Sequence, residues 1–392
     1  MLVFSLSLTI PAAASAREAA FYQKKLSPVA VRLLFEMQEL NRSGEYQKGL
    51  QQFEKFSVKH SKKLPALLNF MAANLNFQLA NYPESVKLYR LVLEKAPEFY
   101  VVYENLGMAL MMTESYRPAA EIFLEAAAFL PEKQQKLKYQ AAIASLYGED
   151  FSKARSLLVK LLADNPEPPA VWFKALIQAH WRLDQSKAAL EIAGRLVDRY
   201  PAAIEHWRLY GQIALSAGEY QLALSAYKVL QTSGRASVKE CKLVARIYQQ
   251  LQLSGAAAAA WESVFVENEP SFQELETLVA LYRQSGQVDK ALKTLNRLQK
   301  LEPGTAIAFR RGKILYHAGR YREAFAIFTK LEKIAEEDGY QYLLAGYCAW
   351  NENDFPAAAT SWNRAADYPT WRDRSLNLLR TLKPWLEAES SG

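Results

Sequence analysis

A short sequence pattern recurs about every 34 residues along most of this 392-residue chain. Each unit has a landmark residue, at which its second run of helix-spaced small and aromatic residues begins. The ten landmarks are Tyr46, Tyr82, Tyr116, Phe151, Ser186, Tyr220, Ser254, Val288, Tyr321 and Phe355. Such a regular period is typical of a helical solenoid, in which each unit buries its apolar face only against its neighbours. We therefore expect one elongated all-α domain, although the length alone would allow two or three globular domains.

Each unit is expected to contain two amphipathic helices. In one clear example, Trp207 and Gly211 recur at helical spacing before Gly218, and Ala223 and Tyr227 do the same after it. The small residues let the two helix backbones approach closely, while the aromatic rings fill the space beside them. Gly218 permits the turn between the two helices.

The unit over residues 103–131 carries the fullest version of the pattern. Its signature residues are Tyr103, Leu106, Gly107, Leu110, Tyr116, Ala119, Phe123, Ala126 and Pro131. In these residues the chain resembles the tetratricopeptide repeat (TPR) family, with Leu110 at a position where an aromatic residue is usual. The resemblance covers about residues 30–370. It implies a right-handed superhelical solenoid of about ten antiparallel helix pairs.

The domain organisation follows from the limits of the repeat. We expect the following order: a signal peptide at 1–16, a lead-in helix at 17–29, the TPR solenoid at 30–370, and a C-terminal capping helix and tail at 371–392. The cap is an amphipathic helix that we expect to break at Pro384. It would cover the apolar face of the last repeat, as solenoids require.

Two repeats match the pattern least well. The repeat from Ala170 has His180 at a position where an aromatic residue is usual, and the repeat from Ser237 carries Cys241 and lacks a glycine at its turn. The second cysteine, Cys348, lies three repeats further on. Packed helices are roughly 8–10 Å apart, so the two cysteines lie beyond the ~7 Å Cα separation that a disulfide allows. We predict two buried thiols.

The N-terminal residues resemble a secretory signal. Residues 2–10 are apolar, Pro11 follows them, and Ala14, Ser15 and Ala16 form a small-x-small site that predicts cleavage after Ala16. A basic region before the apolar run is missing, so either the true start lies upstream of Met1 or the run is not a signal but a frayed apolar N-terminus. No other stretch reaches the ~18 apolar residues that a membrane span requires. We therefore expect a periplasmic or otherwise exported protein, with a cytoplasmic location as the alternative.

Catalytic and cofactor motifs are absent from the sequence. The four histidines lack metal-ligand spacing, and no Cys-x-x-Cys, nucleophile elbow or glycine-rich nucleotide loop occurs. We therefore predict a protein that is not an enzyme and that takes no cofactor or metal. The net charge is +7, but the basic residues are spread along the chain without a nucleic-acid-binding module. Neither nucleic acid nor a small-molecule substrate is indicated as a partner.

The TPR resemblance also implies a binding groove, because in this family the first helix of each pair lines the concave surface. The implied residues of the N-terminal repeats are mainly apolar: Phe70, Asn74, Phe77, Met108, Met111 and Tyr139. Those of the middle repeats are mainly basic: Lys174, Trp181, Arg208, Gln212, Lys242, Arg246 and Arg283. Those of the C-terminal repeats are mainly aromatic: Phe309, Lys313, Tyr316, Tyr347 and Trp350. Such a groove suits an acidic, amphipathic partner segment.

Each stretch has an alternative interpretation. Methionine and aromatic residues at helical spacing also form cores, because a shift of one residue rotates a position by ~100°. The C-terminal aromatic residues would then pack against the capping helix, and the cations would lie on a solvated helix face.

A carboxylate clamp found in some TPR proteins is matched only in part. Asn74, Asn105 and Lys136 stand at three of its five positions, but Phe70 and Gln140 stand at the other two. The loss of two cations removes most of the charge-assisted hydrogen bonds of such a clamp. The resemblance therefore does not imply binding of chaperone tails.

The sequence thus predicts a non-catalytic TPR scaffold or adaptor that binds proteins or peptides. With the signal-like N-terminus, we expect it to assemble an envelope complex in the bacterial periplasm. The arrangement resembles stand-alone TPR proteins of envelope systems, including those encoded beside TonB-type energy-transducing machinery. The alternative is a cytoplasmic TPR regulator or chaperone-like scaffold. The sequence leaves the oligomeric state open.

Overall fold

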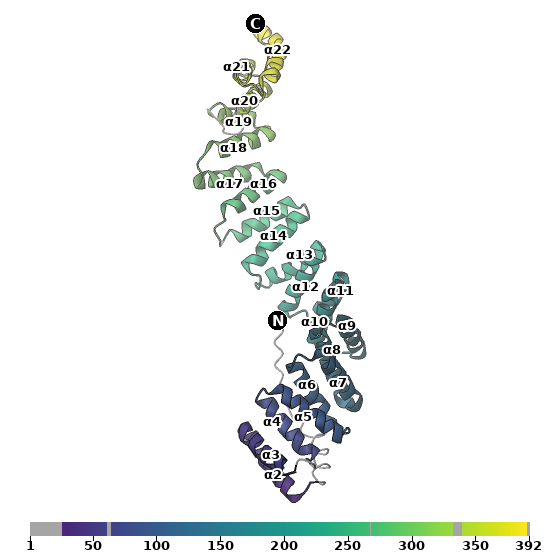
Figure 1. Cartoon of the computed structure of the whole chain (residues 1–392). Helices are drawn as coiled ribbons and strands as arrows, with labels where there is room; N and C mark the ends of the chain where they lie inside the picture. The colour runs from purple at the N-terminus through teal and green to yellow at the C-terminus, as the bar shows by residue number, and fades with distance from the viewer. Residues whose placement is uncertain (1–25, 61–63, 267, 332–338, 390–392) are drawn as a thin grey trace. The chain divides into compact units, whose positions relative to one another are not determined.

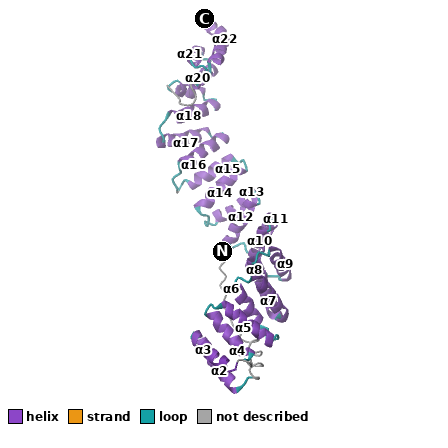
Figure 2. Cartoon of the chain, in the orientation of Figure 1, coloured by secondary structure: helices purple, strands orange, loops and turns teal. Residues whose placement is uncertain are grey.

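The computed structural model describes residues 26–60, 64–266, 268–331 and 339–389 (Figure 1). Throughout this part the chain is helical, and no strand occurs in it (Figure 2). The chain divides into two compact units, one ending at Ala217 and the other beginning at Gly218. The expected signal peptide and most of the lead-in segment, residues 1–25, lie outside the described residues.

The first unit is a series of helices, each of which packs against the next. Their bounds are α2 Pro28–Arg42, α3 Tyr46–His60, α4 Ala66–Gln78, α5 Tyr82–Lys95, α6 Val101–Met112, α7 Tyr116–Phe129, α8 Gln134–Tyr147, α9 Phe151–Asp164, α10 Ala170–Arg182, α11 Ser186–Arg199 and α12 Ile204–Ser216. A short 3-10 helix, Pro131–Lys133, precedes α8.

The second unit has the same construction. Its helices are α13 Tyr220–Thr232, α14 Val238–Gln250, α15 Ser254–Val264, α16 Phe272–Gln284, α17 Val288–Leu301, α18 Thr305–His317, α19 Tyr321–Phe328, α20 Tyr340–Asn351, α21 Phe355–Ala366 and α22 Arg372–Glu389. Consecutive helices again pack against each other. The predicted class, an all-α array of helix pairs, is confirmed.

All ten landmark residues are the first residues of helices. They begin α3, α5, α7, α9, α11, α13, α15, α17, α19 and α21. The two repeats that match the pattern least well keep this register, because Ser186 begins α11 and Ser254 begins α15. The sequence period therefore located every second helix.

A left-handed residue stands two positions before each landmark. These residues are Gly44, Ala80, Glu114, Glu149, Asp184, Gly218, Gln252, Gly286, Gly319 and Asn353, all with φ between 56° and 79°. Only glycine adopts this conformation without steric cost, and other residues lose about 1–2 kcal/mol there. The repeat from Ser237, which carries no glycine at its turn, therefore makes the same turn with Gln252 under backbone strain, as five other repeats do with other non-glycine residues.

This strain leads to a first prediction. We expect Gln252→Gly to raise the free energy of unfolding by about 0.5–1 kcal/mol, because relief of the left-handed strain exceeds the added chain entropy of glycine. Gly286→Ala should lower it by about 1 kcal/mol, although no atom lies within 4 Å of the new Cβ. Urea unfolding of both variants tests the prediction. Equal effects of the two substitutions would show that the turn conformation is not the cause.

Close contacts between glycine and an aromatic ring set the helix spacing within a pair. A Cβ on Gly107 would lie 2.6 Å from the ring of Phe123, and one on Gly312 would lie 2.5 Å from the ring of Phe328. In both pairs the glycine precedes the aromatic residue by 16 positions. A larger residue therefore forces either the ring or the two helices to shift.

The capping helix α22 packs against α21, and its Leu382 is fully buried. It also runs through Pro384 without a break, so the predicted break there was wrong. Proline leaves the carbonyl of Arg380 without its helical partner. Both residues are exposed, so water can bind that carbonyl and the helix continues.

Both cysteines are free thiols. Cys348 is buried, and burial raises the pKa of its thiol to about 12, so it stays protonated. Cys241 is only half-buried; it lies on the same face of α14 as Val244 and Ala245 but one turn nearer the start of the helix. The prediction of burial was therefore right for Cys348 and wrong for Cys241. None of the described helices is long and apolar enough to cross a membrane.

Candidate functional site

Three apolar residues expected in the N-terminal groove lie in the core instead. Phe70 packs its ring 5.0 Å from that of Phe99, and Phe77 packs at 5.2 Å from Tyr82. Met108 is buried as well, and Met111 is half-buried. The buried side chains hold successive helices together and leave little surface for a partner.

Several polar residues of the same region bond to one another. Asn74 accepts hydrogen bonds from the Tyr89 hydroxyl and from the Asn105 amide. The Lys136 ammonium lies 2.7 Å from the buried Glu104 carboxylate, and Lys133 lies 2.8 Å from it. Although burial raises it, the hydrogen bonds from both lysines hold the pKa of Glu104 below its usual value. The three residues that match the carboxylate clamp thus form hydrogen bonds or ion pairs with other residues of the chain.

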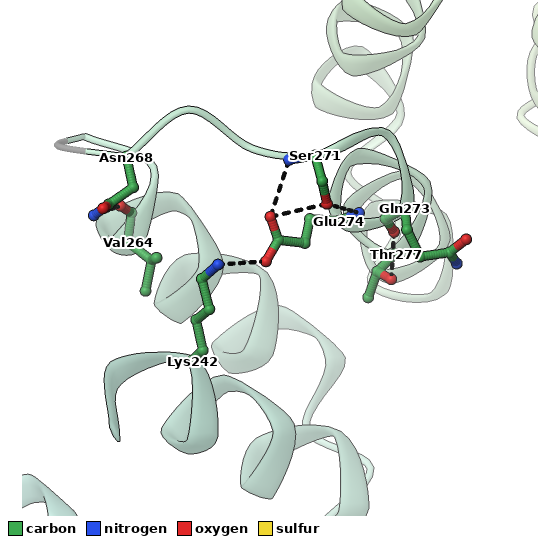
Figure 3. A network of polar contacts seen from close by, with 7 residues as sticks. All are labelled: Lys242, Val264, Asn268, Ser271, Gln273, Glu274 and Thr277. Carbon is green, nitrogen blue, oxygen red and sulfur yellow. Dashed lines mark hydrogen bonds and ion pairs between the residues drawn. The ribbon is translucent and has the colours of Figure 1, made fainter. Parts of the chain in front are cut away.

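In the second unit, Lys242 also pairs with a carboxylate of the chain (Figure 3). Its ammonium reaches from α14 to Glu274 at 2.6 Å, and Glu274 also accepts a hydrogen bond from the backbone N–H of Ser271 in a capping box at the start of α16. A second pair, Arg310 and Glu276, forms at 2.6 Å. Arg246 and Arg283 are exposed. Carboxylates of this unit therefore neutralise part of the expected basic region.

The C-terminal aromatic residues contact each other and the capping helix. Trp350 lies 6.3 Å from Trp385 of α22, and the Tyr347 hydroxyl accepts a hydrogen bond from Arg374 of α22 at 3.0 Å. The remaining members of the set pack within the unit: Phe309 is buried beside Phe328, Lys313 lies over the ring of Phe309 at 5.2 Å, and Tyr316 packs edge-on against Tyr321. The cap thus uses part of this aromatic surface.

An open apolar surface remains in the first unit, along the first helices of three successive pairs. A hollow of about 380 Å³ lies between α8 and α10. It is lined by Tyr139, Ile143, Leu146, Tyr147, Glu149, Val171, Lys174, Ala175, Gln178 and Arg182. A second hollow of about 400 Å³ lies between α10 and α12. It is lined by Lys174, Ile177, Gln178, Trp181, Leu209, Gln212 and Ile213. We call the two hollows together the α8–α10–α12 groove.

Large apolar side chains are exposed in this groove. Tyr147 is 47% exposed, Val171 42% and Trp181 45%. Lys174 and Gln178 line both hollows and therefore form the wall between them. The α10 residues Val171, Lys174, Gln178 and Trp181 recur at i, i+3, i+7 and i+10, which places them on one helix face.

The electrostatics of the groove centre on Lys174. Within the described part of the chain, no carboxylate pairs with the ammonium of this half-buried residue, whereas Arg182 pairs with Glu149 at 3.2 Å. Burial, together with the nearby Lys174 charge, lowers the pKa of His206 at the start of α12. Tyr139 stacks on Trp172 at 6.0 Å, and burial raises the pKa of its phenol to about 12. At neutral pH the groove therefore presents one uncompensated positive charge among apolar side chains.

The lowered pKa of His206 gives a second prediction. The pKa of His206 is about 6.5 in the unfolded chain and lower in the folded chain. The neutral imidazole therefore favours the folded state, so the contribution of His206 to the free energy of unfolding is fully present above pH 6.5 and is lost as the pH falls through the pKa of the folded chain. We expect the melting temperature to drop between about pH 7.5 and 5.5, and to drop less in His206→Gln. The same decline in both proteins would contradict the assignment.

The sequence located this groove only in part. It named Tyr139, Lys174, Trp181 and Gln212. Val171 and Gln178 were omitted, although the helical spacing of Lys174 and Trp181 places them on the same face. The groove is identified by the exposure of its apolar side chains, and the sequence pattern does not reveal which apolar side chains are exposed. Arg208 is half-buried on α12.

Comparison with known proteins supports the repeat assignment. Residues 174–237 and 277–339 match the model of the tetratricopeptide repeat family. No curated protein matches the chain. Among solved structures, a tetratricopeptide repeat protein from Parabacteroides merdae is 17% identical, with 64% of this chain and 98% of that chain covered and a TM-score of 0.33. The C-terminal part of a TPR repeat-containing protein from Cytophaga hutchinsonii is 16% identical, with 62% and 99% covered and a TM-score of 0.48. A structure of Naa15/Naa10 bound to HypK is 13% identical, with 90% and 63% covered and a TM-score of 0.49.

Proposed function

Because the chain is built of tetratricopeptide repeats, we propose that it is a protein-binding scaffold and that the α8–α10–α12 groove holds a segment of its partner. The observation that carries this proposal is the exposure of Tyr147, Val171 and Trp181 beside an unpaired lysine. Exposed apolar residues gathered around a hollow are typical of an interaction site. At the other expected groove regions, many of the corresponding side chains are buried or paired within the chain.

Peptide selection tests this proposal. Random dodecapeptides that bind the purified chain are selected and their affinities are measured by fluorescence anisotropy. Trp181→Ala should weaken their binding by about 2 kcal/mol or more, roughly 30-fold, because large aromatic residues dominate such interfaces. Val171→Ser should weaken binding in the same direction.

The matched control for Val171 is Val159 on α9, which lies outside the groove and is 47% exposed. Val159→Ser should leave the affinities within about twofold of the parent chain. If the selected peptides bind the Trp181 and Val171 variants as tightly as the parent, the groove is not the binding site.

We further propose that the scaffold works in the bacterial periplasm. The proposal rests on the apolar run at residues 2–10 and the small residues Ala14 and Ala16. Cells expressing a C-terminally tagged chain are fractionated, and the N-terminus of the tagged protein is sequenced. We expect a periplasmic protein that begins at Arg17. A cytoplasmic protein that begins at Met1 would contradict this.

An envelope location also indicates which candidate partners should be tested first. We propose that the scaffold assembles an envelope complex, and a TonB-type energy-transducing system is the first to test. Purified periplasmic segments of such a system should compete with a selected peptide for the groove. A segment that binds without displacing the peptide would have to use another surface.

A further inference from the structure

We propose that the partner segment in the α8–α10–α12 groove is extended and acidic, with a carboxylate between two apolar side chains that fill the two hollows. This inference rests on the function proposed above for the groove. It starts from the shape of the site, since Lys174 and Gln178 line both hollows. A ligand that fills both hollows must therefore pass over these two side chains.

Each hollow provides room for one apolar side chain. Ile143 and Val171 contribute to the first hollow, and Ile177 and Leu209 contribute to the second. Apolar side chains of the ligand that enter these hollows remove apolar surface from water on both partners. Two such anchors give the segment a fixed register on the groove.

The charge of Lys174 determines what lies between the anchors. Lys174 is half-buried and, within the described residues, its ammonium forms no ion pair, while the neighbouring Arg182 is compensated by Glu149. A ligand that covers Lys174 with apolar groups would bury an unpaired charge, which is strongly unfavourable. A carboxylate at this point instead forms a charge-assisted hydrogen bond in a partly desolvated site.

The side-chain amides of Gln178 and Gln212 favour a ligand with an extended backbone. Gln178 and Gln212 lie 34 residues apart at equivalent positions of α10 and α12, and both are exposed. In the described part of the chain neither side-chain amide forms a hydrogen bond. Each can donate to a carbonyl and accept from an N–H of the ligand. An extended segment offers such groups, whereas the backbone groups of a helix are already paired.

The helix spacing sets the distance between the anchors. Helices in contact lie roughly 8–10 Å apart, so the hollows on either side of α10 are separated by about that distance. Three residues of a polyproline II chain rise ~9.3 Å and return to the same side. The inferred segment therefore has two apolar residues separated by two others, one of which is Asp or Glu.

A peptide array tests this inference. The probes are decapeptides in which Leu-Glu-Pro-Leu, or the same motif with Phe, Tyr or Trp at either apolar position, is flanked by Gly, Ser and Pro. Each is labelled with fluorescein and titrated with the full chain. We expect Glu→Gln in the best binder to weaken binding at least about tenfold, and binding to weaken as salt increases. Two extra residues between the anchors should also weaken it by about tenfold or more.

A charge exchange identifies the protein side of the contact. Lys174→Glu should weaken binding of the acidic probe by more than about tenfold and restore binding of the same probe with Lys in place of Glu. The control is Lys153→Glu, a half-buried lysine on α9 outside the groove, which should leave both affinities unchanged. Circular dichroism and melting temperature confirm that each variant is folded.

The outcomes separate this inference from the proposed function. Probes that require Trp181 but bind equally with Glu or Gln, and equally to Lys174→Glu, overturn the acidic segment and leave a peptide groove. Probes that bind without requiring Trp181 overturn the groove itself. If no probe of the array binds while selected peptides do, the inferred motif is wrong.

Discussion

Replacing Trp362 with alanine is expected to lower the free energy of unfolding of the second unit by about 3–5 kcal/mol. This side chain is 1% exposed and lies between α20 and α21. Its indole N–H donates to the Leu343 carbonyl at 3.2 Å, and its ring lies 5.6 Å from Tyr347 and 6.0 Å from Trp350. The substitution removes these contacts and leaves a cavity that neighbouring helices fill only in part.

The matched control is Trp385→Ala on the capping helix. Trp385 is 53% exposed and lies at the surface of the last pair, 5.5 Å from Phe355. We expect this substitution to cost about 1 kcal/mol, because little area is buried. Urea unfolding followed by circular dichroism measures the loss of stability in both variants. Similar losses would show that Trp362 is not the centre of this core.

Gly107→Ala and Gly194→Ala are expected to change stability in opposite directions. At Gly107 the new Cβ would lie 2.6 Å from the ring of Phe123, which is buried, so the loss should be about 1–3 kcal/mol. At Gly194, in the middle of α11, the nearest atom is on the Tyr210 ring at 3.8 Å. There alanine should stabilise the helix by about 0.5–1 kcal/mol.

Thermal unfolding of the two single variants checks this pair of predictions. Gly107→Ala should melt below the parent chain, and Gly194→Ala should melt above it. Because both variants carry the same substitution in the same unit, each serves as the control for the other. If both variants shift in the same direction, close packing against Phe123 is not what requires glycine at position 107.

The repeat register could be predicted from the sequence because it depends on local features. Each unit repeats small residues at close helix contacts and aromatic residues that fill the space beside them, as Gly107 and Phe123 show. Every second helix consequently begins at its predicted residue. Gln252 shows that even a missing turn glycine does not shift the register, because the packing of the flanking helices outweighs the backbone strain.

The candidate site could be predicted only in part, because exposure depends on the neighbouring repeat. Phe70 is covered by Phe99, which lies 29 residues later, and Lys242 is neutralised by Glu274, 32 residues later. The position of a residue on its own helix does not reveal such partners. Lys174 occupies a comparable helical position, yet no carboxylate of the described neighbouring helices reaches it. Partners of this kind have to be read from the three-dimensional structure.

The proposed groove would give one repeat array a localised function. Similar helix pairs are repeated along the chain, but α8, α10 and α12 combine exposed apolar side chains with an uncompensated ammonium. At the N-terminal and C-terminal groove positions, internal pairs or the capping helix use many of the corresponding side chains. A scaffold of this kind would hold its partner mainly through two anchors and one charge.

Hydrogen exchange measured with and without a saturating selected peptide tests the binding site most directly. We predict that the peptide slows exchange in segments of α8, α10 and α12, and that Trp181→Ala abolishes this protection. The helices α14, α16 and α18 of the second unit should exchange at the same rate in both samples. Protection confined to those helices, with α8, α10 and α12 unchanged, would contradict the account.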